Sequence, residues 1–257
     1  MIYIKTPEEI ALIKEGGKIL ARILEELGNA VEPGMKTIEL DKLAERLVFK
    51  YGAIAAFKNY KPCFNHEGQG GYPASVCVSI NEEVVHGIPG NRVLREGDIV
   101  SLDMGVLYKG YFTDAAITVG AGKISPIARK LIDVTKKSLE LAIGETKIGN
   151  HLGDIGWAAQ SYAEKNGFSV VRDLVGHGVG KFIHEEPDIP NFGRPGAGLE
   201  LKEGMVLAFE PMVNAGDYKV KTFADGWTFV TVDKSLSAHF EHTVAVTKNG
   251  AEILTKL

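Results

Sequence analysis

Four acidic residues stand inside apolar, strand-like stretches of this sequence, where a carboxylate needs a partner. They are Asp103, Asp114, Glu210 and Glu241, and no Lys or Arg alternates with them as a salt-bridge partner. A buried carboxylate is costly unless it takes a proton, pairs with a cation or binds a metal. The pattern therefore favours a cation site built from acids that lie far apart in the sequence.

The first two acids, Asp103 and Asp114, flank a turn-like segment. A turn centred between Tyr108 and Lys109 would place the two acids directly opposite each other, with Cβ atoms roughly 4.5–5.5 Å apart on one face of a hairpin. For this pair alone, two solvated acids on an exposed hairpin are an equally good interpretation. The recurrence of the same arrangement later in the chain favours the buried site.

That recurrence is an internal echo. Residues 94–103 and 201–210 each read Leu, a basic residue, Glu, Gly, five further residues and a carboxylate. Residues 113–119 resemble residues 240–246 more loosely. Two similar halves that face each other would place the four carboxylates around one centre.

The elements that must position these acids follow from hydrophobic periodicity and from start and stop signals. We predict one domain, residues 1–257, made of two similar halves, about 1–122 and 123–257, each a pair of helices followed by antiparallel strands. The predicted helices span residues 6–27, 37–51, 125–143 and 149–166. The predicted strands span residues 75–80, 98–106, 110–119, 168–172, 205–210 and 239–247.

Three of the seven histidines stand in glycine-rich or turn-like contexts and are candidate ligands. His177 is bracketed by glycines, which let the backbone and a ligand approach closely. His86 directly follows a strand-like run, and His184 lies seven residues after His177. A histidine added to four carboxylates gives selectivity toward transition metals, and more than one bridging acid argues for two ions about 3.5–4 Å apart. The residues alone therefore favour a two-metal hydrolase.

Three further histidines carry no local signal of a ligand. His151, His239 and His242 lack a comparable context. His242 neighbours Glu241, but it should point to the opposite face of the sheet because side chains alternate along a strand.

Together these residues resemble the type I methionine aminopeptidases of the pita-bread fold, in their short bacterial form, over essentially the whole chain. The motifs that carry the resemblance are Gly71-Tyr72-Pro73, Ser79-Ile80-Asn81-Glu82, Val85-His86-Gly87-Ile88-Pro89, Gly176-His177-Gly178-Val179-Gly180, Phe209-Glu210-Pro211 and Phe240-Glu241-His242-Thr243. The resemblance implies an α+β fold, a single catalytic domain with a pseudo-two-fold antiparallel sheet and two pairs of helices outside it. It also implies removal of the initiator methionine from nascent proteins, with a preference for a small second residue.

The resemblance further implies a share for each ligand in a site for two divalent ions. Asp103 would hold one ion, His177 and Glu210 the other, and Asp114 and Glu241 would bridge the pair. Co, Mn, Fe or Zn would suit such a site, since availability decides among them.

Catalytic roles follow from the same resemblance. A water or hydroxide bridging the metals would attack the first peptide carbonyl. Glu210 would act as general base, His184 would bind the developing oxyanion, and His86 would contact the scissile nitrogen.

The resemblance also implies a methionine pocket lined by Tyr72, Cys77, Ile183 and Trp227. Outside the resemblance, Cys77 and Trp227 read as core residues. Gln69-Gly70-Gly71 departs from the family pattern, which puts one wall of the pocket in question.

Composition excludes several other classes of protein. The net charge of −4 offers no footprint for nucleic acid or an anionic membrane. No apolar run approaches the roughly 20 residues of a membrane span, and the first residues lack a signal-peptide core. Two cysteines, Cys63 and Cys77, fit a reducing compartment. We expect a cytoplasmic monomer whose partners are the N-terminal methionines of peptides and nascent chains, with the ribosome as a further candidate.

Related proteins provide the competing interpretations. A non-catalytic binding protein on the same fold would have lost metal ligands, and all five are present here. A prolidase-like dipeptidase shares the ligands but carries a large domain ahead of them, whereas about a hundred residues precede Asp103. Type II enzymes carry an insertion between the second substrate histidine and the fourth ligand, and His184 and Glu210 stand only 26 positions apart.

Overall fold

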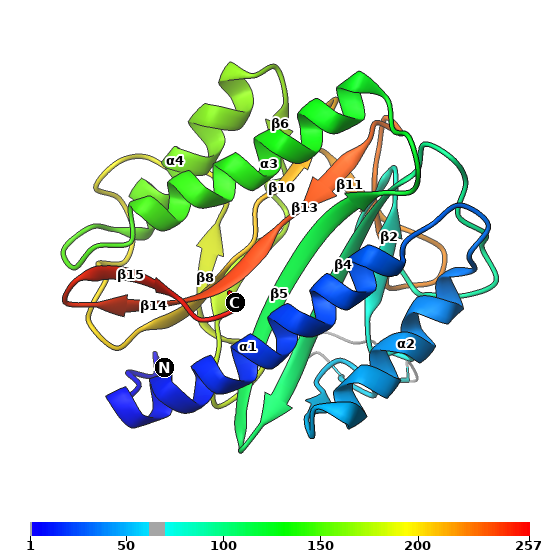
Figure 1. Cartoon of the computed structure of the whole chain (residues 1–257). Coiled ribbons are helices and arrows are strands. Elements are labelled where there is room, and N and C mark those ends of the chain that lie inside the picture. Colours follow the sequence, from blue (N-terminus) through cyan, green and yellow to red (C-terminus); the bar gives the residue numbers. More distant parts are fainter. Residues whose placement is uncertain (1, 62–69) are drawn as a thin grey trace.

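The computed structural model describes residues 2–61 and 70–257, so Cys63 and Gln69 lie outside the described residues. Each of two helix pairs is followed along the chain by a run of strands (Figure 1). The helices are α1 (Pro7–Ala30), α2 (Thr37–Lys50), α3 (Pro126–Gly144) and α4 (Leu152–Lys165). The strands are β1 (Ile54–Ala55), β2 (Cys77–Ile80), β3 (Glu83–Val85), β4 (Ile99–Tyr108), β5 (Tyr111–Gly120), β6 (Ser169–Val170), β7 (Val175–Gly178), β8 (Glu185–Pro190), β9 (Val206–Phe209), β10 (Met212–Asn214), β11 (Val220–Thr222), β12 (Phe229–Thr231), β13 (Ser237–His239), β14 (Glu241–Thr247) and β15 (Gly250–Ile253).

All four predicted helices form, and local capping explains where two of them begin. The Thr6 hydroxyl accepts from the Glu9 N–H at 3.3 Å, and the Glu9 carboxylate accepts from the Thr6 N–H at 2.8 Å. This reciprocal capping box fixes the start of α1. α4 starts later than predicted because the His151 N–H donates to Asp154 Oδ2 at 2.7 Å, which ties the backbone at that point.

A single antiparallel sheet runs through the two halves of the chain. Its order is β1-β4-β5-β14-β9-β7-β8, with β2 paired to β4 and β15 paired to β14. β5 pairs directly with β14, where Glu241 lies opposite Ala116. Elements distant in the sequence therefore meet at the middle of the sheet. The similarity of the halves 1–122 and 123–257 stays a prediction.

Side-chain alternation divides the long strands between two faces. On β4, Leu102 and Met104 pack with residues of α1 and α2 in one hydrophobic core, and Asp103 between them points to the other face. On β9, Leu207 and Phe209 pack with residues of α3 and α4 in a second core. The two helix pairs thus cover one face of the sheet (Figure 1), and the acids project from the other.

The turn between β4 and β5 is a two-residue turn, Lys109-Gly110, and Tyr108 pairs with Tyr111. Both turn residues have positive φ, 48° at Lys109 and 85° at Gly110. A type I′ turn requires this conformation, and its twist matches that of the strands it joins.

This register corrects the predicted hairpin. Asp103 pairs with Ala116, and Asp114 pairs with Gly105. The prediction that the two acids lie directly opposite each other is therefore wrong. They still share one face as diagonal neighbours, because each stands two residues from the other's partner.

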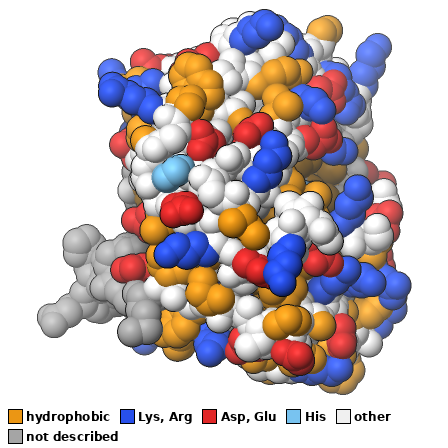
Figure 2. Space-filling view, turned by 90° about the vertical axis from the view of Figure 1, so that its left-hand side faces the viewer, with side chains coloured by type: hydrophobic (Ala, Val, Ile, Leu, Met, Phe, Trp, Pro, Cys, Tyr) orange, Lys and Arg blue, Asp and Glu red, His pale blue; other side chains and the backbone are white. Residues whose placement is uncertain are grey.

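Charge is mixed on the face of the molecule shown in Figure 2, and no described helix is suited to crossing a membrane. Within residues 2–61 and 70–257, no helix combines the length and the apolar character needed to cross a membrane. Figure 2 shows acidic and basic side chains interspersed on the face that it presents. This mixture agrees with the small net charge of −4.

Candidate metal centre

The five predicted ligands converge at the middle of the large sheet, each from a different strand or strand end. Asp103 lies on β4, Asp114 on β5, His177 on β7, Glu210 directly after β9, and Glu241 at the start of β14. Asp103, Asp114 and Glu241 form one group whose ligand atoms all lie within 4.8 Å of one another, and His177, Glu210 and Glu241 form another. Glu241 belongs to both groups, so the five side chains form one cluster.

Two alanines leave room between these ligands. Ala116 pairs with Asp103 on one side and with Glu241 on the other. Ala208 pairs with His177 on the neighbouring strand. Because paired residues share a face of the sheet, the two small side chains lie on the same face as the ligands beside them.

Burial makes the four carboxyl groups weak acids in the metal-free protein. It raises the pKa of Asp103 to about 7. It also raises the pKa of Glu210 to about 7, although His177 acts in the opposite direction. The pKa values of Asp114 and Glu241 rise well above their ordinary range, first through burial and then through the neighbouring carboxylates.

The donor set fits divalent cations. Asp103 Oδ1 and Glu241 Oε1 are buried without a hydrogen-bond partner among the described residues. His177 Nε2 lies 3.9 Å from Asp114 Oδ2 and 3.7 Å from Glu210 Oε1. In the described part of the chain, the ion-pair partners of these carboxylates are histidines and not Lys or Arg. Oxygen ligands with one imidazole suit divalent transition metals.

His177 is oriented by its own backbone. Its Nδ1 lies 2.9 Å from the carbonyl oxygen of Gly178. Because a carbonyl only accepts, Nδ1 carries the proton and Nε2 keeps its lone pair toward the carboxylates. The bracketing glycines are required, since a Cβ on Gly176 would lie 2.3 Å from the Ala208 carbonyl oxygen.

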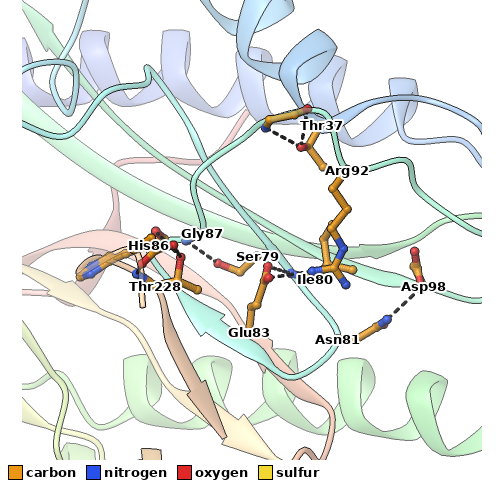
Figure 3. A network of polar contacts seen from close by, with 12 residues as sticks. Thr37, Ser79, Ile80, Asn81, Glu83, His86, Gly87, Arg92, Asp98 and Thr228 are labelled. Atoms are coloured by element: carbon orange, nitrogen blue, oxygen red, sulfur yellow. Dashed lines mark hydrogen bonds and ion pairs between the residues drawn. The ribbon is translucent and has the colours of Figure 1, made fainter. Parts of the chain in front are cut away.

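His86 is held beside the centre by the segment that follows β3 (Figure 3). The next N–H, that of Gly87, donates to Ser79 Oγ at 3.1 Å, and the Thr228 hydroxyl donates to the His86 carbonyl at 3.4 Å. The His86 ring packs edge-on against Phe229, with centroids 5.8 Å apart. Burial, with the nearby imidazoles, lowers the pKa of His86 to about 4, so the ring is neutral at pH 7.

His184 stands directly before β8 and is exposed to solvent. Its ring packs against His177 at a centroid distance of 4.4 Å, and its Nδ1 lies 2.6 Å from the Tyr60 hydroxyl oxygen. The following residue, Glu185, anchors the segment through a buried ion pair with Lys5. Although one side of the side chain is open to solvent, partial burial of the ring against the site, followed by the nearby imidazoles of His177 and His86, lowers the pKa of His184.

The four predicted pocket residues form one apolar cluster next to the carboxylates. Tyr72, Cys77 and Ile183 are buried in it, and Trp227 packs against them. The rings of Tyr72 and Trp227 meet edge to face at 5.3 Å. Cys77 pairs with Asp103 across β2 and β4, so the pocket adjoins the cluster of ligands.

Sequence context missed one histidine of the site. His239 is fully buried in the site, and its Nε2 lies 3.4 Å from Glu210 Oε2. The alternation that turns His242 away also places His239, two residues before Glu241, on the side of the acids. His242 does point away, since its Nδ1 lies 2.9 Å from the Thr255 hydroxyl oxygen.

Tyr60 and Phe57 also belong to the surroundings of the site and escaped prediction. Phe57 is buried in the pocket cluster, and Tyr60 contacts both that cluster and His184. Both lie in an irregular segment after β1 that has no hydrophobic periodicity. No pattern in the sequence marks such residues.

Comparison with known proteins agrees with this geometry. Residues 11–248 match the sequence pattern of the family described as "Metallopeptidase family M24". The chain belongs to metallopeptidase family M24. Among its M24 relatives, methionine aminopeptidase of Clostridium perfringens is 52% identical over 99% of both chains. Methionine aminopeptidase 1 of Bacillus subtilis is 51% identical over 100% of both chains. Divalent metal use follows from membership of this metallopeptidase family.

Solved M24 structures confirm the predicted pita-bread fold. Methionine aminopeptidase from Thermotoga maritima superposes with a TM-score of 0.95 at 47% identity, covering 100% of both chains. Prolidase from Pyrococcus furiosus superposes with a TM-score of 0.75 at 25% identity, covering 99% of this chain but 65% of the prolidase. The chain matches the aminopeptidase over the whole length of both proteins, whereas it covers only part of the prolidase.

The metal-free protein should lose stability as the pH rises from 6.5 to 8. Carboxyl groups with raised pKa values in the folded protein keep protons that the unfolded chain has released. Each such group therefore lowers the free energy of unfolding by about 1.4 kcal/mol per pH unit, up to its pKa in the folded protein. Asp103 and Glu210 contribute up to about pH 7, and Asp114 and Glu241, whose pKa values are raised well above their ordinary range, contribute in the same direction. Histidines with lowered pKa values act in the opposite direction, but only below about pH 6.5.

Thermal melts with a chelator at several pH values measure this slope. Added Mn²⁺ should stabilise the protein more at pH 8 than at pH 6.5, because bound metal requires deprotonated ligands. A melting temperature that is constant or rises over this range would contradict the assignment of buried, mutually repelling acids.

Proposed function

We propose that the chain is a methionine aminopeptidase that uses two divalent metal ions to remove the initiator methionine from nascent proteins. The observation that carries the proposal is the junction of the ligand cluster with the apolar pocket, where Cys77 pairs with Asp103. Relatives named methionine aminopeptidase, 52% and 51% identical over nearly the whole chain, support it.

Each ligand has a proposed share in the two metal sites. Asp103 would hold one ion, His177 and Glu210 would hold the other, and Asp114 and Glu241 would be shared between the two. The membership of Glu241 in both groups of close ligand atoms supports this division. When bound, the ions polarise the scissile carbonyl and lower the pKa of a water molecule. Co, Mn, Fe and Zn all suit the ligand set, and metal analysis of protein purified without added cations distinguishes them.

Three side chains are proposed to transfer the proton of the attacking water and to stabilise the charge that develops on the substrate. Glu210 takes a proton from the attacking water and passes it toward the leaving nitrogen. His184, at the exposed side of the cluster, donates to the substrate carbonyl oxygen as negative charge develops there. His86 contacts the scissile nitrogen and assists its departure. The lowered pKa values of both histidines keep them neutral donors at pH 7.

Two tripeptides and one dipeptide test the proposed activity. The metal-loaded protein should release methionine from Met-Ala-Ser and leave Ala-Pro intact, and a chelator should stop the reaction. Met-Ala-Ser should also react faster than Met-Lys-Ser, since a small second residue is preferred. Hydrolysis of Ala-Pro would identify a prolidase-like dipeptidase instead, and the absence of metal-dependent release would indicate a non-catalytic protein.

The pocket is proposed to select methionine through shape and apolar contact. Ile183 is 4% exposed and packs with Tyr72 and Cys77. Ile183→Ala removes part of the wall, and each lost methylene contact costs about 1–3 kcal/mol of discrimination. We expect kcat/KM for Met-Ala-Ser to fall about 10- to 100-fold, mainly through KM, and the rate for Phe-Ala-Ser to rise.

The matched control for this change is Ile148→Ala, at a position that is 50% exposed. It should leave both rates unchanged. Unchanged selectivity in Ile183→Ala would place the methionine side chain elsewhere.

The setting of the reaction is proposed from the nature of the substrate. Initiator methionine is exposed on chains leaving the ribosome, so we infer a cytoplasmic enzyme that acts there as a monomer. Light scattering of the purified protein measures its oligomeric state, and cosedimentation with ribosomes tests the contact.

A further inference from the structure

His239 is a buried histidine at the metal centre to which the proposed reaction assigns no role. It ends β13, and its side chain has 0% exposure. Neither ring nitrogen has a hydrogen-bond partner among the described residues. A buried polar group without a partner lowers the free energy of unfolding by about 1–3 kcal/mol. A histidine at this position therefore destabilises the fold unless its ring interacts with a neighbouring group.

The backbone fixes where this ring lies. The His239 N–H donates to Thr118 Oγ1 at 2.9 Å, and the Thr118 hydroxyl donates to the His239 carbonyl at 2.7 Å. On the other side, His239 pairs with Met212 of β10. With its backbone held from both neighbouring strands, His239 has little freedom to turn away from the cluster.

The group nearest to its ring is the carboxylate of Glu210. His239 Nε2 lies 3.4 Å from Glu210 Oε2, while His177 Nε2 lies 3.7 Å from Glu210 Oε1. Glu210 therefore stands between two imidazoles, one facing each of its oxygens. His177 must keep its Nε2 lone pair free, because its Nδ1 donates to a carbonyl. His239 has no such constraint and is the histidine able to donate from Nε2.

We propose that His239 is a positioning residue that donates a hydrogen bond from Nε2 to Oε2 of Glu210 and so presents Oε1 to the metal ion shared with His177. The inference rests on the proposed assignment of Glu210 as ligand and general base. His239 is absent from the groups of ligand atoms that lie within 4.8 Å of one another, which distinguishes it from a metal ligand. Outer hydrogen bonds of this kind typically change metal affinity by 10- to 100-fold.

Two substitutions separate the hydrogen bond from simple packing. His239→Leu fills the space without a donor, whereas His239→Gln retains an N–H donor. In calorimetric titration of the metal-free proteins with Mn²⁺, we expect His239→Leu to bind the ion shared by His177 and Glu210 10- to 100-fold less tightly and His239→Gln to bind it within about threefold of the native protein. With Met-Ala-Ser, kcat should fall in the Leu variant with little change in KM, and Gln should restore most of it. The visible spectrum of the Co²⁺-loaded protein should change in the Leu variant alone.

The matched control is His242→Leu, which removes a histidine from the opposite face of the same stretch and should leave Mn²⁺ affinity unchanged. Native affinity in His239→Leu, or equal loss in the Leu and Gln variants, would overturn the proposal. If His239→Leu does not fold, ¹⁵N spectra of the native Zn²⁺-loaded protein decide, because the proposal requires the Nε2–H tautomer of His239 and fails with the Nδ1–H form. Metal affinity is measured without substrate, so a protein that binds metal but releases no methionine would refute the proposed function and leave this test intact.

Discussion

Glu241→Gln should stabilise the metal-free protein while it abolishes metal-dependent release of methionine. Glu241 is 2% exposed, and its Oε1 has no hydrogen-bond partner among the described residues. Burial and then the carboxylates of Asp114, Glu210 and Asp103 raise its pKa well above the ordinary range. At pH 8 this buried carboxyl is costly whether it is charged or holds a proton that the unfolded chain has released, and an amide removes both costs and adds N–H donors whose bonds the neighbouring carboxylates can accept.

The two expected effects have different sizes and opposite directions. Replacing one charge of a buried, unneutralised cluster should increase the free energy of unfolding by about 1–3 kcal/mol, which corresponds to a rise of roughly 2–10 °C in melting temperature. Glu241 is shared by both metal sites in the proposed assignment. Bound metals stabilise the transition state by several kcal/mol. Loss of this stabilisation should lower kcat at least about 1000-fold.

Melts with a chelator at pH 8 and rates with saturating Mn²⁺ measure the two effects on one variant. Glu252→Gln is the control, because Glu252 lies on β15 and makes a half-exposed ion pair with Lys14 at 2.6 Å. It should change neither quantity appreciably. A metal-free Glu241→Gln protein that melts lower than the native one would show that the cluster is neutralised in some other way.

Much of the site could be predicted because alternation along a strand is a strict rule. On β4, the apolar neighbours Leu102 and Met104 enter the core under the helices, which forces Asp103 to the other face. The same rule excluded His242 correctly. It also applies to His239, which was wrongly left out because its flanking sequence has no glycine or turn to mark it. A residue two positions from a ligand along an extended stretch, as His239 at the end of β13 is from Glu241 at the start of β14, is therefore a better candidate than its immediate context suggests.

The details that could not be predicted depend on backbone conformations with weak sequence signals. The register of the β4–β5 hairpin depends on Lys109 adopting a φ of 48°, which a lysine rarely does. The contact between Tyr60 and His184 joins residues 124 positions apart, and neither belongs to a periodic element. The glycines that bracket His177 were more informative, because the close approach of the Ala208 carbonyl to Gly176 leaves no space for a side chain.

His184→Ala should lower turnover by about 100- to 1000-fold and leave both metals bound. The expected loss corresponds to the removal of one donor to a developing oxyanion, about 2.7–4 kcal/mol. Metal should remain because the proposed ligands come from five other side chains. The retention of metal is a demanding test, since a ligand atom of His184 lies within 4.8 Å of those of Asp114 and His177.

The measurements are kcat and KM with Met-Ala-Ser, and the Mn²⁺ content after dialysis. His86→Ala should give the same pattern, because His86 contacts the scissile nitrogen in the proposed assignment and no metal. His151→Ala is the control, since His151 lies at the start of α4 and its Nδ1 is 3.9 Å from Asp154 Oδ2, remote from the ligand strands. Loss of metal from His184→Ala would make His184 a ligand and would transfer the role of oxyanion donor to another group. Full turnover with metal bound would instead show that the metals alone stabilise the oxyanion, because the pocket and all five ligands are intact in that variant.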